Sequence, residues 1–324
     1  MNIILLSGGC GKRLWPLSTE NRSKQFLKII KNEDGSYESM LQHMYRIICS
    51  ADDNVSVTVA TSENQVDTIR EQIGDNVHIS VEKCRRNTFP AIALAVAYLH
   101  DVQGVSEDEV VIVCPVDSYI GYDYAKILRK LNEEAQVDGA NLILMGVEPT
   151  YPSEKFGYII PETIDSVSFV KHFKEKPDAA TAVKYIKDGA LWNCGVFAFR
   201  MSYVLSIAEK VFSSARYQFL ADNYSKMESI SFDYAVVEKE ETIKVVRFSG
   251  TWNDIGTWDS LMSAMNVDTI GDSTVYESKN TQIINELPIP IMALGVNNLA
   301  IVATSKGILV VDKDSAENIK DYIE

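Results

Sequence analysis

The chain opens with a short apolar strand and a glycine-rich loop, Ile3-Ile4-Leu5-Leu6-Ser7-Gly8-Gly9-Cys10-Gly11-Lys12-Arg13-Leu14-Trp15-Pro16, and Lys24-Gln25 follow soon after. Three glycines in four positions let the backbone adopt positive φ angles and approach a ligand closely, and the amides of such a turn can converge on an anion. The segment from Lys12 to Lys31 contains six basic residues and one glutamate. Its net charge is about +5, in a chain of formal charge −14. The sequence therefore predicts a phosphate-binding loop after the first strand.

The spacing of the loop excludes two familiar phosphate motifs. A dinucleotide fingerprint needs a glycine where Leu14 stands, and a P-loop needs one where Leu6 stands. The pattern G-G-x-G-x-R-L-x-P with a lysine about ten residues later resembles the signature of nucleoside-diphosphate-sugar pyrophosphorylases. The strings Leu14-Trp15-Pro16-Leu17-Ser18 and Lys24-Gln25-Phe26-Leu27 resemble the mannose-1-phosphate guanylyltransferase branch of that family. An ordinary glycine turn is the alternative reading of the glycines alone.

Composition indicates a globular protein with no membrane span. The chain has 324 residues and 46% hydrophobic residues, and its longest apolar run, 91–99, is far shorter than the ~20 residues that a membrane helix needs. Five widely spaced cysteines without a C-x-x-C pair argue against a disulfide framework and against a structural zinc site, and we expect free thiols in the cytoplasm. The acidic charge, with no basic helix, disfavours nucleic acid as a partner.

Strands and helices alternate along the first half of the chain. We expect strands at 55–60, 77–81, 109–114 and 142–147, and helices at 37–49, 63–73, 89–102 and 123–135. This alternation predicts an α/β fold with a parallel sheet, and ligands of such sheets bind at the carboxyl ends of the strands. The glycine loop and the segments 82–88 and 115–118 should then lie along one edge and face one crevice.

The second half of the chain is expected to add a mixture of strands and helices to the same core. Strands are expected at 157–160, 167–173, 191–199 and 242–248, with helices at 178–187 and 257–265. From residue 271 short β-prone pieces dominate, among them 299–304 and 308–311, and 316–323 can form a final helix. No repeat is evident. The prediction is a nucleotidyltransferase domain at 1–270 and a short β-rich C-terminal segment at 271–324, and the resemblance implies a Rossmann-like, GT-A-like mixed sheet that is mostly parallel and flanked by helices.

Two aspartates are candidate ligands of a divalent cation. Asp117 follows a buried strand, and Asp254 lies beyond another strand, before Gly256 and a helix. Either could instead cap a turn or a helix. Mg²⁺ is commonly held by few carboxylates together with phosphate oxygens and waters, and the resemblance implies that this pair binds Mg²⁺ or another divalent cation. The family usually has a histidine where this chain has Ser118.

The segment from Glu82 to Ala95 resembles the family pattern E-P-x-x-R-N-T-x-P-A-I-A-L-A, with Lys83 in place of the proline. Read without the family, it is a helix entry with Thr88 as the N-cap. The resemblance implies that Glu82 accepts hydrogen bonds from the N1–H and N2–H₂ edge of guanine, and that Asn87 and Thr88 contribute to nucleotide binding.

Three further segments resemble family motifs. They are F-x-E-K-P at 173–177, W-N-x-G-x-F at 192–197, and S-I-D-Y-A-V-M-E-K at 231–239, which reads SFDYAVVEK in this chain. An isolated E-K pair is usually solvated surface. The resemblance implies that Gly157, Glu175, Lys176 and Asn193 bind the sugar phosphate.

The resemblance implies transfer of GMP from GTP to mannose 1-phosphate. In that reaction Arg13, Lys24 and Lys176 are the expected catalytic residues. The expected nucleotide-binding residues are Gly8, Gly9, Gly11, Lys12, Arg13, Lys24, Glu82, Asn87 and Thr88. The expected partners are GTP and mannose 1-phosphate, and the sequence leaves open whether the chain forms a homodimer. The competing interpretations are an enzyme for a different sugar or base, and a catalytically silent regulatory protein of the same fold.

One expectation comes from the placement of the thiols. Cys10 lies inside the basic loop, where Lys12, Arg13 and convergent amides should stabilise its thiolate. We therefore expect Cys10 to be reactive, whereas Cys114 and Cys194 can also be read as small buried residues.

Overall fold

A computed structural model of the chain describes residues 1–9, 14–19, 22–32, 34–265 and 267–322. The chain divides into two compact units. The first unit comprises Met1–Gly8, Ile47–Pro115 and Gly121–Thr251, and the second comprises Gly9–Arg46, Val116–Ile120 and Trp252–Glu324. The predicted boundary at residue 270 remains a prediction.

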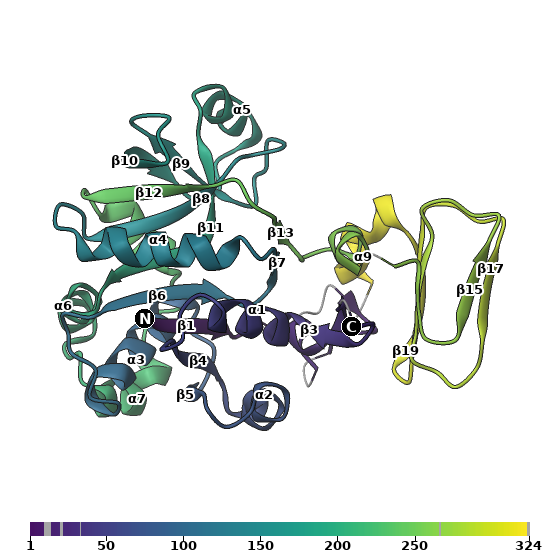
Figure 1. Ribbon diagram of the computed structural model, residues 1–324, viewed down its shortest axis with the longest axis horizontal. Coiled ribbons are helices and arrows are strands. Elements are labelled where there is room, and N and C mark those ends of the chain that lie inside the picture. The colour runs from purple at the N-terminus through teal and green to yellow at the C-terminus, as the bar shows by residue number, and fades with distance from the viewer. Residues whose placement is uncertain (10–13, 20–21, 33, 266, 323–324) are drawn as a thin grey trace. The chain divides into compact units, whose positions relative to one another are not determined.

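The first unit is built on a mixed sheet of nine strands in the order β5-β4-β1-β6-β11-β8-β12-β10-β9 (Figure 1). The strands are β1 (Asn2–Ser7), β4 (Ser56–Ser62), β5 (His78–Glu82), β6 (Val110–Pro115), β8 (Leu142–Val147), β9 (Gly157–Pro161), β10 (Val167–Lys174), β11 (Leu191–Arg200) and β12 (Ile243–Phe248). Neighbours from β5 to β6 pair in parallel, as do β8 and β12, whereas β11 runs antiparallel to both β6 and β8. The expected α/β fold with a mixed, mostly parallel sheet is confirmed.

Helices cover both faces of this sheet. They are α2 (Val66–Ile73), α3 (Thr88–Asp101), α4 (Tyr124–Gln136), α5 (Ala179–Lys187), α6 (Met201–Phe212), α7 (Tyr217–Asn223) and α8 (Phe232–Ala235), with 3₁₀ turns η3 (Glu63–Gln65), η4 (Tyr224–Lys226) and η5 (Val237–Lys239). Helix α3 shares a core cluster with Val111 and Val113 of β6, whereas Tyr124 of α4 hydrogen-bonds Cys114 of the same strand. Adjacent residues of a strand point to opposite faces, so α3 and α4 lie on opposite sides of the sheet.

The carboxyl ends of the parallel strands form one edge of the first unit. Gly8 follows β1, Glu82 ends β5, and Pro115 ends β6, and the register pairs Leu6 with Pro115. Strand β11 runs the other way, so its beginning, with Asn193, reaches the same edge. Gly8, Glu82, Pro115 and Asn193 come from distant segments of the sequence and lie along this one edge.

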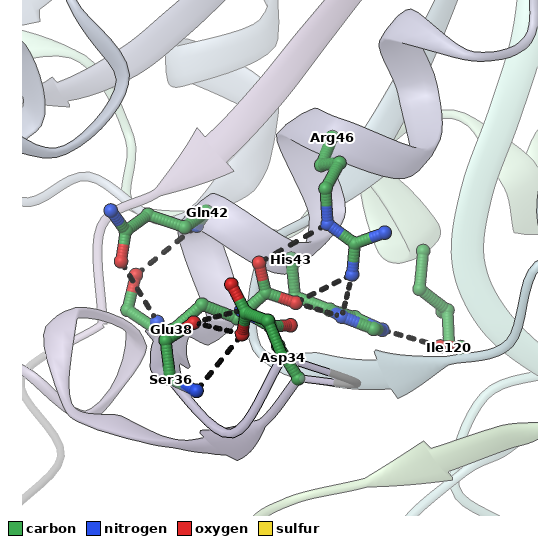
Figure 2. A network of polar contacts seen from close by, with 9 residues as sticks. Asp34, Ser36, Glu38, Gln42, His43, Arg46 and Ile120 are labelled. Carbon is green, nitrogen blue, oxygen red and sulfur yellow. Dashed lines mark hydrogen bonds and ion pairs between the residues drawn. The ribbon is translucent and has the colours of Figure 1, made fainter.

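The second unit contains a helix that starts later than expected. The sequence pattern predicted a helix over 37–49, but 37–39 form strand β3 (Tyr37–Ser39), paired with β2 (Lys28–Lys31), and α1 covers Met40–Cys49. The side chain of Gln42 accepts from the Ser39 amide and the Ser39 hydroxyl accepts from the Gln42 amide, both at 3.1 Å (Figure 2). This reciprocal capping box fixes the start of the helix.

A hydrophobic cluster around the buried Trp258 holds the rest of this unit together. It includes residues of α9 (Trp258–Met265), the loop residues Leu14 and Leu17, and Ile284 and Val302 from the C-terminal strands. The 3₁₀ turn η2 (Lys24–Phe26) and the short antiparallel pair β7 (Ser118–Ile120) and β13 (Trp252–Asp254) also belong here.

Two of the parallel pairings among the C-terminal strands, β15 with β17 and β16 with β18, join residues 18 positions apart and form successive turns of a coil. The strands are β14 (Thr269–Ile270), β15 (Ser273–Tyr276), β16 (Gln282–Asn285), β17 (Ile291–Leu294), β18 (Leu299–Thr304) and β19 (Gly307–Asp312), followed by η6 (Lys313–Asp321). Ser273 pairs in parallel with Ile291, and Ile283 pairs with Ile301. Asn280 and Asn298, both at positive φ, stack through a 2.8 Å side-chain hydrogen bond. The expected final helix is a 3₁₀ helix.

None of the helices in the described ranges combines the length and apolar character needed to cross a membrane.

Candidate active site

Lys24 is a buried cation in the second unit. It lies in the 3₁₀ turn η2, and its side chain is only 10% exposed. Its Nζ donates to the carbonyl oxygen of Ile255 at 2.6 Å and lies 3.0 Å from Asp117 Oδ2. The ammonium is therefore held at a fixed point beside a carboxylate, as a group that stabilises phosphoryl oxygens must be.

The two predicted metal ligands come together through the β7–β13 pair. Asp254 pairs with Ser118, and Asp117 is the residue directly before Ser118. The backbone of Asp254 is thus brought next to the residue that follows Asp117, although the two aspartates are far apart in sequence. Ser118, the departure from the family pattern, is a buried member of this ladder.

Gly256 makes room for the Asp254 carboxylate. A Cβ atom at this position would lie 3.1 Å from Asp254 Oδ2, which is closer than ordinary van der Waals contact. A larger residue at 256 would have to displace that carboxylate.

A buried polar network supports β7 from one side (Figure 2). His43 Nε2 lies 2.7 Å from the carbonyl oxygen of Ile120, and Nδ1 lies 2.7 Å from Glu38 Oε1. The imidazole also stacks on Tyr119, with ring centroids 5.2 Å apart. Both partner oxygens can only accept, so the two hydrogen bonds form together when both ring nitrogens carry protons.

Glu38 is the anion of this network. Burial alone would raise its pKa, but hydrogen bonds from Arg46 and His43 outweigh burial and hold the pKa of Glu38 below its ordinary value. Arg46 Nη2 donates to Glu38 Oε1 at 2.6 Å. Glu38 and His43 thus tie α1 to the Ile120 carbonyl of the strand that follows Asp117.

The donor set of the second unit fits a divalent cation. Among the described residues no group of three or more His, Cys, Asp or Glu side chains gathers as a complete ligand sphere. Asp117 already faces a cation, the Lys24 ammonium, and is 44% exposed. Two carboxylates on backbone segments that the β7–β13 pair brings together, one of them 44% exposed, suit Mg²⁺, which keeps waters and phosphate oxygens in its sphere.

Glu82 is a mostly buried carboxylate at the end of β5. Its Oε2 accepts from the Tyr224 hydroxyl at 2.8 Å, and its Oε1 lies 3.2 Å from the position of a Cβ on Gly8. Burial raises the pKa of Glu82, while the hydrogen bond from Tyr224 and the charge of Arg85 act in the opposite direction. The carboxylate is therefore an acceptor fixed next to the end of β1.

The helix entry after Glu82 differs from the expectation. Thr88 is not the N-cap but the first residue of α3, and Asn87 occupies the cap with φ 67°, accepting from the Thr88 amide at 2.9 Å. Asparagine tolerates this left-handed conformation better than β-branched threonine. The Thr88 hydroxyl instead accepts from the Phe232 amide at 2.8 Å.

Glu175 and Lys176 form a close pair in the first unit. Lys176 Nζ lies 2.7 Å from Glu175 Oε1, and Lys176 has the positive φ of 44°. Burial opposes the charge of Lys176, but the hydrogen bond to Glu175 and the charges of Glu175 and Asp233 together outweigh burial and raise the pKa of Lys176. A Cβ on Gly157 would lie 2.5 Å from Glu175 Oε2, so only glycine fits there without a rearrangement.

Asn193 extends this group toward Asp233. Its Nδ2 donates to Asp233 Oδ1 at 2.6 Å, and its Oδ1 accepts from the Gly195 amide at 3.1 Å. Burial, together with the charge of Glu175, raises the pKa of Asp233 to about 6. The structure thus gathers one cation, two carboxyl groups and an amide, the chemistry that binds hydroxyls and a phosphate.

Several predicted residues lie outside the described part of the chain. Gly11, Lys12, Arg13 and Cys10 are among them, so their expected roles remain predictions. Cys114 and Cys194 are buried, and burial raises the pKa of Cys114 to about 12. These two thiols fit the reading as buried residues.

Sequence reasoning missed three functional candidates: Asp233, Tyr224 and the Ile255 carbonyl. The SFDYAVVEK string singled out the helix that carries Asp233 but not the residue itself. No sequence signal marks a backbone carbonyl as the partner of Lys24.

A cavity of about 770 Å³ in the first unit contains none of the predicted site residues. It is lined by residues such as Asn141, Arg200 and Tyr203, beside the amino ends of β8 and β12. Parallel sheets bind ligands at the opposite edge, so we do not assign the reaction to it.

Comparisons with known proteins identify the family of the chain. The model of the nucleotidyl transferase family matches residues 2–270. A mannose-1-phosphate guanylyltransferase from Salmonella muenchen is 32% identical, over 99% of this chain and 72% of the relative. The alginate biosynthesis protein AlgA from Pseudomonas fluorescens is 31% identical, over 99% of this chain and 70% of the relative.

A solved structure covers nearly the whole chain as well. The crystal structure of a Thermus thermophilus protein, named a mannose-1-phosphate geranyltransferase, has a TM-score of 0.83 and 26% identity. The match covers 99% of this chain and 97% of that one. The chain belongs to the nucleotidyl transferase family.

Proposed function

We propose that this chain transfers GMP from GTP to α-D-mannose 1-phosphate. A phosphate oxygen of mannose 1-phosphate forms a bond to the α-phosphorus of GTP, and the bond between that phosphorus and the oxygen bridging to the β-phosphorus breaks. The products are GDP-mannose and pyrophosphate. A sugar phosphate is largely dianionic near neutral pH, so the nucleophile needs no general base, and catalysis consists of positioning and charge neutralisation.

The observation that carries the reaction class is the group of Lys24, Asp117 and Asp254. A buried ammonium fixed by a carbonyl and a carboxylate, with a second carboxylate on the adjacent strand, suits a phosphoryl group with its metal ion. Lys24 would steady the α-phosphoryl oxygens. Asp117 and Asp254 would hold Mg²⁺ or another divalent cation, which when bound neutralises phosphate charge and orients the reacting oxygens.

The residues of the first unit support the choice of substrates. Glu82 is an oriented double acceptor for the N1–H and N2–H₂ donors of guanine, which adenine does not offer. Glu175 and Asn193 would bind sugar hydroxyls, and Lys176 would bind the sugar phosphate. Gly8, Gly9, Gly11, Lys12 and Arg13, with Asn87 and Thr88, complete the proposed nucleotide contacts.

We also propose that the enzyme acts in the cytoplasm, where nucleoside triphosphates are made and thiols stay reduced. A second copy of the chain is the only macromolecular partner that we propose, and neither nucleic acid nor membrane is expected.

The test is a substrate panel with the purified full chain. GTP, ATP, UTP and dTTP are each combined with mannose 1-phosphate or glucose 1-phosphate, with Mg²⁺ or with EDTA, and nucleotide sugar and pyrophosphate are quantified. We expect GDP-mannose and pyrophosphate in equal amounts, dependent on the metal. A different preferred pair would identify another sugar nucleotidyltransferase, and binding without any product would indicate a silent regulatory protein.

A further inference from the structure

One segment of the first unit is tied along its length to the proposed base-binding segment. Residues 222–232 run from the end of α7 to the start of α8, and residues 82–89 run from the end of β5 into α3. Five polar contacts join them: Tyr224 to Glu82, Asp222 to Lys83, the Ser225 carbonyl to Arg86, the Phe232 amide to Thr88, and the Phe89 amide to the Ile230 carbonyl. The position of the base-binding segment therefore depends on residues about 140 positions further along the chain.

Tyr224 is the most buried of these contacts. Its side chain is 0% exposed and belongs to the core cluster of the first unit. Its hydroxyl donates to Glu82 Oε2 at 2.8 Å, and a buried phenol needs such a partner. The 3₁₀ turn η4 (Tyr224–Lys226) fixes the backbone that presents the hydroxyl.

We infer that Tyr224 is a positioning residue that keeps the Glu82 carboxylate ionised and oriented to accept hydrogen bonds from guanine. This inference rests on the proposed function, in which Glu82 is the reader of the base. Each carboxylate oxygen has two acceptor sites, so Oε2 can accept from Tyr224 and still face the base, while Oε1 lies at Gly8.

The chemistry of the pair explains why the hydroxyl matters. Burial favours the neutral carboxyl form of Glu82, and a neutral carboxyl presents an O–H donor where guanine also offers N–H donors. The hydrogen bond from Tyr224 stabilises the charged form. The positive charge of Arg85 also favours the ionised form of Glu82. Gly8, which follows β1 and lies next to Glu82, has no side chain and adds no charge. Arg86 and Cys84 affect the pKa of Tyr224.

The test compares Tyr224→Phe with the wild-type full chain. Phenylalanine keeps the buried ring and removes only the donor. We expect kcat/KM for GTP to fall about tenfold near neutral pH, the scale of one hydrogen bond to a charged group, chiefly through a higher KM. The acid limb of the pH profile of kcat/KM should move to higher pH, and activity should recover toward wild type in alkaline solution.

Two control variants make the result specific. Tyr217→Phe makes the same change on α7, where the ring packs against Tyr98, and its pH profile should match wild type. In a Glu82→Gln background, which has no ionisable group at 82, adding Tyr224→Phe should leave the acid limb unmoved. Replacing Tyr224 with 3-fluorotyrosine, a stronger donor of nearly the same size, should shift the limb to lower pH.

The outcomes separate the two proposals. If Tyr224→Phe and the fluorotyrosine enzyme both keep the wild-type acid limb and the wild-type KM for GTP, while Glu82→Gln loses preference for GTP over ITP and ATP, Tyr224 has no positioning role and the base assignment stands. If Glu82→Gln keeps wild-type base preference, the assignment of Glu82 itself is wrong.

Discussion

Lys24 Nζ lies 3.0 Å from Asp117 Oδ2, and the same ammonium is held at 2.6 Å by the carbonyl oxygen of Ile255. Lys24 therefore contacts Asp117, the same carboxylate that is proposed to bind the metal ion. Two positive charges near one carboxylate repel each other, so Lys24 should weaken metal binding while it stabilises the phosphoryl group. This opposition separates the two roles experimentally.

Lys24→Met should lower turnover while tightening the binding of the metal. Methionine has a similar length and suits the buried position, so the change removes mainly the charge. We expect kcat to fall at least ~100-fold, the scale of removing one key electrostatic group, and the dissociation constant of Mn²⁺, measured by calorimetry without nucleotide, to decrease. Lys28→Met, the same change on the exposed residue of β2, is the control. Weaker metal binding in Lys24→Met would contradict this account.

Asp117→Asn and Asp254→Asn should each abolish most turnover without unfolding the chain. Asparagine is isosteric and keeps an acceptor oxygen, but it removes a charge that the cation needs. A loss of at least ~10²-fold is expected in each variant, with a wild-type melting temperature. Asp123→Asn, on an exposed aspartate nearby in sequence, serves as the control. Near wild-type turnover in either metal-site variant would exclude that residue as a ligand.

The placement of these aspartates shows what the sequence could predict and what it could not. Buried strands such as Leu142–Val147 and Leu299–Thr304 were predicted to the residue because short apolar runs bounded by turn residues are typical of strands. The three-residue strands β7 and β13 carry no such pattern, and they form because their partners exist. The positions of Asp117 and Asp254 at strand ends were therefore predicted from the sequence. The β7–β13 pairing that brings their backbones together was not.

The C-terminal coil escaped prediction for a related reason. Its 18-residue spacing is a property of two backbone pairings, and only a few side chains repeat, such as Asn280 with Asn298 and Ile283 with Ile301. From the sequence alone, short strands separated by residues at positive φ cannot be distinguished from an irregular β-rich segment. Asn87 was missed as a cap because its left-handed φ is invisible without the structure.

His43→Phe should destabilise the chain and weaken its use of metal. Phenylalanine can still stack on Tyr119, but it leaves the buried Ile120 carbonyl without its His43 partner and removes one hydrogen bond to Glu38, which keeps those from Arg46. A loss of about 1–3 kcal/mol in the free energy of unfolding is expected for unsatisfied buried groups, along with a higher Mg²⁺ concentration for half-maximal activity. His172→Phe, on an exposed residue of β10, should do neither. Unchanged metal dependence would show that the network supports stability alone.

Lys176→Ala should impair the use of mannose 1-phosphate and spare GTP. The lysine is held by Glu175 at 2.7 Å and is half exposed, as a phosphate-binding cation should be. We expect the KM for mannose 1-phosphate to rise at least ~10-fold, the scale of a charge-assisted hydrogen bond, with GTP affinity unchanged by calorimetry. Lys171→Ala, at an exposed position of the preceding strand β10, is the control. Equal loss of GTP affinity would refute this division of roles, for which Arg13→Ala should give the reverse result.

Asp233→Asn should stabilise the chain above pH 6 and progressively less below it. Burial raises the pKa of this carboxyl from 3.8 to about 6 in the folded protein, so between those values the folded state binds more protons than the unfolded chain. The free energy of unfolding therefore rises as pH falls through this window, and above it the ionised carboxylate destabilises the fold. Removing the ionisation should gain no more than about 3 kcal/mol at pH 7.5, at 1.36 kcal/mol per pH unit, while the Asn193 hydrogen bond can be kept by the new amide oxygen. Urea unfolding at pH 7.5 and pH 4.5 measures the difference, with Asp75→Asn at an exposed site as the control. A gain of the same size at both pH values would mean that the ionisation of Asp233 is not what strains this part of the fold.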